Sequence, residues 1–122
     1  MKTDVWFFQK NGTMMSKPEK WEVWLAEVRF EDSPEKKKRP VVIVAPNIAY
    51  YLSLKVTTHP PRTQYPGEYV LQMWQEAGLA KPSTVRASKL LKLRDSDFCG
   101  KVGRLHPIDI MELREILDSL YS

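Results

Sequence analysis

The sequence has a single cysteine, two histidines and no long apolar segment, and each shortage excludes a class of protein. One cysteine, Cys99, allows neither an intrachain disulfide nor a cluster of cysteine ligands for a metal. No apolar run approaches the length of a membrane span, and the apolar residues 5–8 are too few for the core of a signal peptide. We therefore expect a cytoplasmic protein that does not associate with a membrane.

The familiar catalytic motifs are also missing. The chain contains no Gly-rich phosphate loop, no HExxH, no GxSxG and no pair of Cys-x-x-Cys motifs. Its histidines, His59 and His106, are far apart in the sequence and no third ligand accompanies them, so we expect neither a metal nor another cofactor. Any catalysis must come from Arg, Thr, Ser, His or Tyr side chains.

The charge of the chain is distributed unevenly. The 122 residues form one domain of ordinary composition, with 43% hydrophobic and 28% charged residues and a net charge of +4. Residues 107–122 hold four acids and one base, a net charge of −3, whereas the other 106 residues hold 18 bases and 11 acids, a net charge of +7. A basic body of this kind is consistent with an anionic partner.

The sequence predicts two strands at the centre of the chain, and the rest of the fold is predicted around them. Residues 41–45 form a continuous β-branched and apolar run between prolines, which is typical of a strand buried on both faces. Residues 51–57 alternate between apolar and polar, which predicts one face in the core and one in solvent. The second strand ends in the polar residues Thr57, Thr58, His59 and Arg62, interrupted by two prolines. Such a cluster fits a functional site, but taken alone it fits an ordinary transition from strand to loop better.

Further strands are predicted over residues 21–30, 68–72, 84–93 and 98–105, with one helical turn over 73–77 that ends at Gly78. Residues 31–38 form a charged loop that is either a solvated hairpin loop or a mobile basic lip beside Arg39. A helix begins at Pro107 behind a His106 cap, with Asp109 in its first turn. Its apolar stripe, opposite the acids, is Ile110, Leu113, Leu117 and Leu120.

Short strands with little helix between them predict a mainly β (α+β) fold, a small bent antiparallel barrel or sheet with a terminal helix. Residues 1–20 are interpreted as an N-terminal appendage because they hold the Asn11-Gly12 turn signal and a linker-like stretch at 16–20. The domain itself is expected to span residues 21–122.

The order of several segments resembles the MazF/PemK family of toxins from type II toxin–antitoxin pairs, over residues 22–120. The segments are WLAEVRF, KRPVVIVAPN, LKVTTHPPR, EYVLQ, STVRASKLLKL, GKVGRL and the final helix. The resemblance implies an SH3-like β-barrel that pairs into a homodimer. It also implies a metal-independent endoribonuclease that cuts single-stranded RNA at short sequences and is restrained by a cognate antitoxin protein.

The family's functional residues can be matched one at a time. The arginine before the proline of the second strand falls on Arg39, and the threonine at the end of the third strand falls on Thr57. An arginine that some members use in a later strand falls on Arg86. Those members place an acid two residues further on, where this chain has Ser88, so the acid–base role of that residue does not transfer. The glycine–acid pair that usually opens the family's first strand is Trp21-Glu22 here, which is a lesser departure.

These residue types suit RNA cleavage without a metal, in which the 2′-hydroxyl attacks the adjacent phosphate. The protein must move two protons and stabilise charge on the phosphoryl oxygens. Arg39 can stabilise the negative charge on the phosphoryl oxygens, and Arg86 is a candidate second clamp on the phosphate. Thr57 can add a neutral hydrogen bond, and His59 is the candidate that titrates near neutral pH. The candidate RNA-binding residues are Lys37, Lys38, Thr58, Arg62 and Ser88. Candidate stacking surfaces are Tyr50, Tyr51, Tyr65 and Trp74.

Two other functions remain open from the sequence. A toxin of the same fold could act on another target, as the gyrase-directed CcdB proteins do, or the domain could bind nucleic acid or protein without catalysis. Ser88 favours these alternatives, whereas Arg39 together with Thr57 favours the enzyme. A binding domain would show strong salt dependence and form no product.

Overall fold

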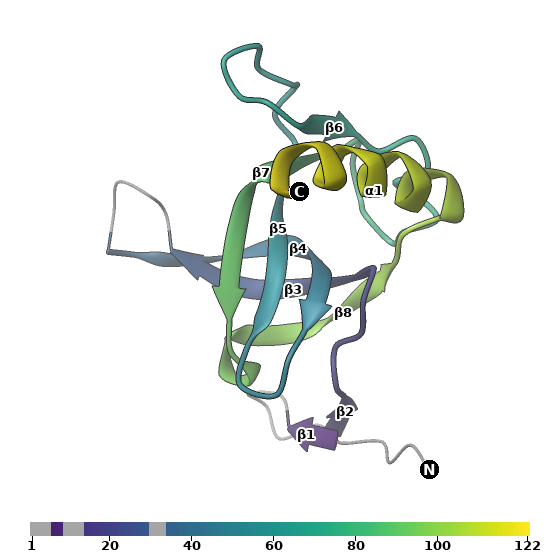
Figure 1. The fold of residues 1–122 in the computed structure, drawn as a ribbon. Helices are drawn as coiled ribbons and strands as arrows, with labels where there is room; N and C mark the ends of the chain where they lie inside the picture. Colours follow the sequence, from purple (N-terminus) through teal and green to yellow (C-terminus); the bar gives the residue numbers. More distant parts are fainter. Residues whose placement is uncertain (1–5, 9–13, 30–33) are drawn as a thin grey trace.

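The computed structural model describes residues 6–8, 14–29 and 34–122 of the chain. Its main body is an antiparallel sheet of six strands with one α-helix packed beside it (Figure 1). The elements are β1 (Trp6–Phe8), β2 (Met14–Ser16), β3 (Glu22–Arg29), β4 (Lys36–Pro46), β5 (Tyr51–Thr57), β6 (Glu68–Val70), β7 (Thr84–Leu93), the short 3-10 helix η1 (Asp95–Asp97), β8 (Phe98–Arg104) and α1 (Pro107–Tyr121).

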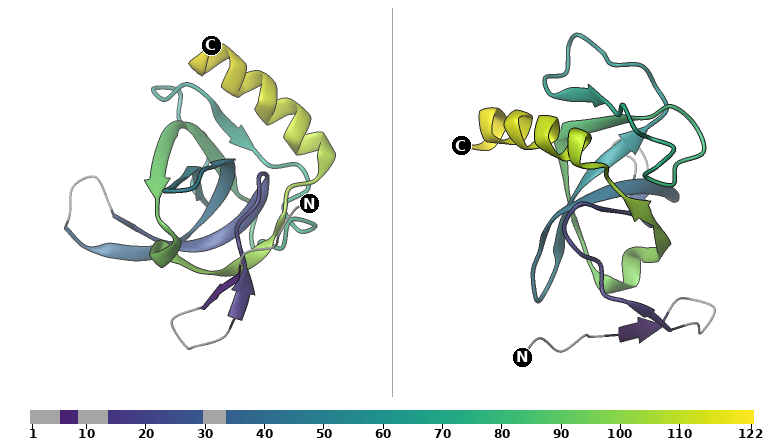
Figure 2. Two further views of the ribbon diagram at one scale, coloured as in Figure 1. Left: turned by 60° about the horizontal axis from the view of Figure 1, so that its bottom comes forward. Right: turned by 90° about the vertical axis from the view of Figure 1, so that its right-hand side faces the viewer.

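The sheet has the strand order β6-β7-β5-β4-β3-β8, and every neighbouring pair is antiparallel. Register shifts interrupt the β3–β8, β4–β5 and β5–β7 pairs, and such bulges increase the local twist and bend a sheet. The sheet therefore curls around its core (Figure 2). The predicted bent antiparallel sheet with a terminal helix is confirmed, although its hydrogen-bonded order stays open at β6 and β8 rather than closing into a barrel.

The N-terminal segment contributes a hairpin of its own. β1 and β2 pair antiparallel in a separate two-stranded sheet, at the end of the molecule opposite α1 (Figure 1). The Asn11-Gly12 turn signal and the acidic half of the charged loop, Glu31 to Ser33, lie outside the described residues. The basic half of that loop is not a loop, because β4 begins at Lys36 and pairs with β3 from there.

The two central strands are placed as predicted, but only β4 has the predicted burial. Val42 lies in one core cluster while Val41 and Ile43 lie in the other, so this strand is buried on both faces. The predicted solvent face of β5 is wrong for its first half, since Tyr51 and Leu54 are buried on opposite faces. The curl of the sheet covers both faces there, because it brings η1 and β8 across the second face.

Two hydrophobic clusters make the core. The first lies between the sheet and α1, which contributes Leu113 with Ile116, Leu117 and Leu120. The second lies across the other face and contains Trp24, Tyr51 and Phe98, whose rings meet edge to face. Their centroids are 5.8 Å apart for Trp24 and Phe98 and 5.2 Å apart for Tyr51 and Phe98. Edge-to-face pairs at this spacing add favourable electrostatics to the buried area.

The terminal helix begins and packs as predicted, with one correction. His106 caps it, because its Nδ1 accepts a hydrogen bond from the amide of Ile108 at 3.1 Å, and Pro107 follows at the first helical position. Asp109, however, does not lie on the solvent side with the other acids. It is 0% exposed and accepts hydrogen bonds from the Tyr69 hydroxyl at 2.6 Å and from the Gln72 and Met73 amides at 2.9 and 3.0 Å.

The predicted single helical turn over residues 73–77 is present as one hydrogen-bonded turn, and it does not continue into a regular helix. The Ala77 amide donates to the Met73 carbonyl, and the Gly78 amide donates to the Gln75 carbonyl. The Met73 amide, at the start of this turn, donates to Asp109, as the unpaired amides at the start of a helix commonly donate to a side-chain oxygen. Gly78 does end the turn as predicted, with φ of 90°, and a Cβ at this position would collide with the Val102 carbonyl.

A strained residue stands at the entry to β3. Trp21 adopts φ of 70°, a left-handed conformation that favours glycine and is unusual for a bulky side chain. A glycine would adopt this geometry without strain, whereas this chain buries an indole there in the first core cluster. The neighbouring Glu22 is also buried, and it accepts hydrogen bonds from the Trp24 indole at 3.0 Å and the Lys101 ammonium at 2.7 Å.

Asp109 gives a direct stability prediction. Asp109→Ala leaves two backbone amides and the Tyr69 hydroxyl without their acceptor, so we expect the free energy of unfolding to fall by about 3 kcal/mol. Glu112→Ala, which removes an exposed acid from the same helix, should change it by less than about 0.5 kcal/mol. Urea denaturation measures both values, and equal midpoints for the two variants would contradict the assigned role of Asp109.

Candidate active site

A pocket of about 530 Å³ opens where β4 begins, β5 ends and β7 begins. Most of the residues singled out from the sequence line it. These are Lys38, Arg39, Thr57, Thr58, His59, Arg62 and Arg86, together with Pro40, Lys55, Val56 and Ser83. The polar cluster after β5 therefore lines a hollow in the surface, next to side chains from β4 and β7.

Cross-strand pairing explains how residues far apart in the sequence meet here. Lys55 on β5 lies opposite Arg86 on β7, and Arg86 lies opposite Glu68 on β6. Residues that lie opposite one another in a sheet point to the same face. A single cross-strand row therefore presents an ammonium, a guanidinium and a carboxylate in sequence.

Arg39 and Thr57 belong to the same face. Val41 lies opposite Lys55 in the β4–β5 ladder, and Arg39 and Thr57 each lie two residues from this pair along their strands. Because side chains alternate along a strand, a step of two residues keeps the same face. The Arg39 guanidinium also donates to the Lys38 carbonyl at 2.8 Å, which fixes it beside its own strand.

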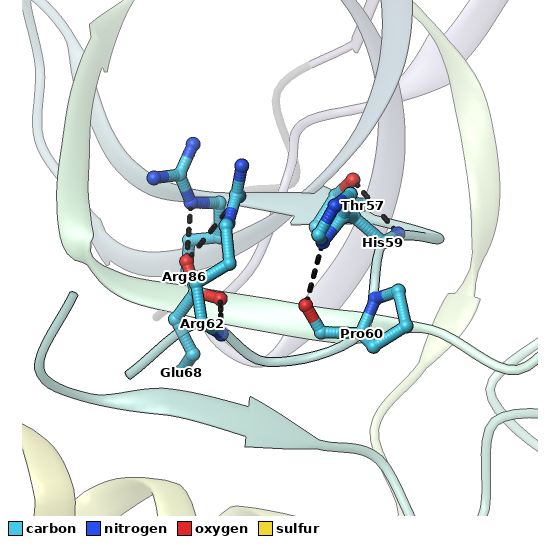
Figure 3. A network of polar contacts seen from close by, with 6 residues as sticks. All are labelled: Thr57, His59, Pro60, Arg62, Glu68 and Arg86. Atoms are coloured by element: carbon cyan, nitrogen blue, oxygen red, sulfur yellow. Dashed lines mark hydrogen bonds and ion pairs between the residues drawn. The ribbon is translucent and has the colours of Figure 1, made fainter. Parts of the chain in front are cut away.

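Glu68 is the acceptor at the end of the row. Its side chain is 1% exposed, and it accepts hydrogen bonds from Arg86 Nε at 2.8 Å, from the Arg62 amide at 2.9 Å and from Arg62 Nη2 at 3.4 Å (Figure 3). Burial raises the pKa of the Glu68 carboxyl, but these three hydrogen bonds outweigh burial, and the pKa lies below its ordinary value. The carboxylate is therefore ionised at neutral pH.

Arg86 is the least accessible cation of the pocket, with 6% of its surface exposed. The Tyr65 ring covers the guanidinium, with the ring centroid 4.7 Å from Arg86 Cζ and 5.0 Å from Arg62 Cζ. Lys89 approaches the same ring at 5.6 Å. Cations at these distances are attracted by the ring quadrupole, so Tyr65 holds the two arginines together from one side.

The other aromatic candidates have different surroundings. Tyr51 is buried in the second core cluster, which excludes it as a stacking surface, and Trp74 packs against the first cluster. Tyr50 is half-buried, with the Lys92 ammonium 4.4 Å from its ring centroid. None of these three rings lines the pocket.

His59 lies in the pocket although β5 ends before it. The chain bends after Thr57, and the His59 amide donates to Thr57 Oγ1 at 3.2 Å. Its ring Nδ1 lies 2.7 Å from the Pro60 carbonyl oxygen (Figure 3). A carbonyl can only accept a hydrogen bond, so Nδ1 carries the proton, and in the neutral ring Nε2 is the nitrogen with a lone pair.

Two of the predicted RNA-binding residues lie outside the pocket. Lys37 is exposed further out on β4, opposite Val28 of β3. Ser88 is half-buried in the register shift of β7, where residues 87–89 have no partner on β5. The structure therefore does not bring either residue together with Arg39 and Thr57.

The sequence reasoning missed Glu68, Lys55 and Ser83. Ser83 donates to the Lys81 carbonyl at 2.8 Å and shapes the rim. Glu68 did carry a signal, because it is the only acid between Glu35 and Glu76, in a stretch that holds six bases. An isolated acid in a basic stretch is a candidate partner for one of its arginines, although the sequence does not say which one.

Within the described residues, no group of three or more His, Cys, Asp and Glu side chains is placed to hold a metal ion. In the same part of the chain, no helix has the length and apolar character needed to cross a membrane.

Comparison with known proteins gives a family and a fold. The family model for the PemK-like, MazF-like toxin of type II toxin–antitoxin systems matches residues 19–121. No curated protein matches the sequence. Among solved structures, an endoribonuclease from a mycobacterial species, in complex with its cognate antitoxin, superposes with a TM-score of 0.65 at 15% identity, over 84% of this chain and 93% of that one.

Two further solved structures resemble this chain to a similar degree. A mycobacterial endoribonuclease gives a TM-score of 0.64 at 15% identity, over 84% of this chain and 88% of its own. MazF from Deinococcus radiodurans gives 0.60 at 20% identity, over 84% and 94%. At these identities the likenesses establish the fold.

Proposed function

The chain belongs to the family of PemK-like, MazF-like toxins of type II toxin–antitoxin systems, and we propose that it is an endoribonuclease that cleaves single-stranded RNA in the pocket around Arg39. The observation that carries this proposal is the grouping of Arg39, Thr57, His59 and Arg86 around one pocket, from β4, β5, the following bend and β7. Similar folds are those of endoribonucleases, which supports the same reaction.

The proposed reaction is attack by a 2′-hydroxyl on the neighbouring phosphate. His59 Nε2 accepts the proton of the 2′-hydroxyl while the bond from the 2′-oxygen to phosphorus forms and the bond from phosphorus to the 5′-oxygen breaks. The leaving 5′-oxygen takes up a proton from water. The products are a 2′,3′-cyclic phosphate and a 5′-hydroxyl, and no oxidant, reductant or second substrate is needed.

Charge on the phosphoryl oxygens is stabilised by the cations of the pocket. Arg39 and Arg86 carry planar guanidinium groups that bind phosphate through two parallel hydrogen bonds, and Lys55 adds a point charge. Thr57 supplies a neutral donor beside them. Because these side chains provide the positive charge that a metal would otherwise supply, we propose that cleavage is independent of metal ions.

The partners follow from the family and from the charge of the chain. We propose that the protein is a homodimer in the cytoplasm, cuts at short sequences, and is restrained by a cognate antitoxin protein, as the mycobacterial endoribonuclease is bound to its own. The net charge of +7 outside residues 107–122 favours both RNA and an acidic antitoxin segment. Residues 1–20 are proposed to be an appendage to the toxin domain at 21–122.

The first test is cleavage of a long single-stranded RNA in EDTA. We expect wild type to produce discrete fragments and Arg39→Ala to cleave at least about 100-fold more slowly, because one donor to the reacting phosphate is lost. Arg104→Ala, which removes an exposed arginine of β8 outside the pocket, should cleave as wild type does. Binding of RNA by wild type without any fragments would favour a binding domain or a toxin with another target.

The second test addresses His59 as the base. We expect His59→Ala to lower the cleavage rate about 100-fold or more and to change the pH dependence of the rate, because the proposed proton acceptor is lost. His106→Ala removes the chain's only other histidine, at the helix cap and outside the pocket, and should leave that pH dependence unchanged. A His59→Ala variant with an unchanged rate and pH profile would exclude the proposed base.

A further inference from the structure

A buried carboxylate, that of Glu68, lies directly behind the arginines of the pocket. A phosphate is repelled by a nearby anion, and Glu68 is ionised, buried and hydrogen-bonded directly to one of the pocket's guanidinium groups. It does not line the pocket itself. Its position behind the arginines indicates that it acts on them rather than on the substrate.

The Glu68 carboxylate holds the Nε edge of the Arg86 guanidinium. Glu68 Oε2 accepts from Arg86 Nε at 2.8 Å, and the same oxygen accepts from Arg62 Nη2 at 3.4 Å. The other oxygen, Oε1, accepts from the Arg62 amide at 2.9 Å. The carboxylate therefore joins β7 to the loop that precedes β6, and it is held in turn by a backbone donor that cannot rotate away.

The free edge of Arg86 faces the pocket. With Nε bound to Glu68 and the Tyr65 ring over the guanidinium, the two terminal nitrogens point away from Glu68 (Figure 3). A guanidinium presents two terminal N–H groups in a fixed fork that matches two oxygens of a phosphate. Without the carboxylate, the long side chain could adopt other rotamers, and binding would have to order it.

We infer that Glu68 is a positioning residue, which holds Arg86 in the orientation that binds the reacting phosphate. This inference rests on the proposed function, because it assigns the phosphate of the RNA to the free edge of Arg86. Glu68 touches neither substrate nor reacting atoms and acts only through Arg86.

The role needs a carboxylate rather than an amide. Three donors converge on the two oxygens of Glu68, from Arg86 Nε, Arg62 Nη2 and the Arg62 backbone. A glutamine at this position offers one oxygen, and its NH₂ group would face a donor at the other position. Glu68→Gln therefore keeps the size of the side chain but removes the negative charge beside Arg86, and it loses either the bond to the Arg62 amide or the bonds to both guanidinium groups.

The test is a double-mutant cycle on single-turnover cleavage, with Glu68→Gln, Arg86→Ala and the double variant. We expect Glu68→Gln alone to reduce the rate about 10- to 100-fold, as misplacement of a catalytic group does. In the Arg86→Ala background the same change should alter the rate less than about twofold, because its target is absent. Equal reductions in both backgrounds, or a wild-type rate for Glu68→Gln, would overturn the inference.

Glu22→Gln is the matched control for loss of a buried carboxylate. Glu22 is buried, accepts from the Glu19 amide, the Trp24 indole and the Lys101 ammonium, and lies outside the pocket. Below its melting temperature this variant should cleave at the wild-type rate. If Glu68→Gln does not fold, Glu68→Asp replaces it in the cycle, since aspartate keeps the charge but withdraws it by one methylene from Arg86.

The same cycle separates this inference from the proposed function. Should wild type cleave no RNA, the proposed enzyme is excluded, and the cycle is then measured as equilibrium binding of an uncleavable 2′-O-methyl oligonucleotide. The positioning role would still be supported if Glu68→Gln weakens binding when Arg86 is present but not when Arg86 is replaced by alanine. Equal weakening in both backgrounds, or none, would overturn it.

Discussion

A nearly buried guanidinium needs a negative partner, and the pairing of Arg86 with Glu68 meets this need. Removing either charge leaves the other in a poorly solvated site, which is strongly unfavourable. The pair also determines the path of the chain. Glu68 binds the Arg62 amide, so the loop from Thr58 to Gly67 folds back over β7 and places His59 and Arg62 at the pocket.

The short strand β6 connects this site to the terminal helix. Neighbouring residues of a strand point to opposite faces, so Glu68 reaches the arginines while Tyr69 reaches Asp109 of α1. Burial raises the pKa of the Tyr69 hydroxyl to about 12, and the hydrogen bond to Asp109 acts in the same direction, so the phenol stays protonated and donates. α1 therefore holds β6 through Tyr69, and β6 holds Arg86 through Glu68. The helix itself contributes no residue to the pocket.

Local pattern predicted much of this arrangement. The apolar run after Arg39 is a strand because β-branched residues between prolines favour one, and the helix follows from its cap and its apolar stripe. The positions of Arg39, Thr57 and Arg86 came from their place in an ordered set of motifs. Lys37 belongs to the basic stretch before Arg39, and Ser88 falls where some family members have an acid, but the register of β4 and the shift in β7 place both outside the pocket.

The roles of Glu68 and Asp109 depend on partners that no local pattern identifies. Glu68 on β6 is hydrogen-bonded to Arg86 on the neighbouring strand β7, 18 positions later. Asp109 accepts hydrogen bonds from two backbone amides of a loop 36 and 37 positions earlier. An acid in the first turn of a helix is usually predicted to be exposed, with its negative charge stabilised by the helix dipole. Only the packing of α1 against the sheet shows that Asp109 is the acceptor for the loop after β6.

The proposed mechanism requires that a 2′-hydroxyl of the RNA is the nucleophile. This can be measured with an RNA of mapped cleavage sites in which a single nucleotide, the one that precedes one scissile phosphate, carries hydrogen in place of its 2′-hydroxyl. We predict that cleavage stops at that site alone, and that fragments from the other sites end in a 2′,3′-cyclic phosphate. Continued cleavage at the substituted site would show that water or another group attacks the phosphate, and would contradict the mechanism.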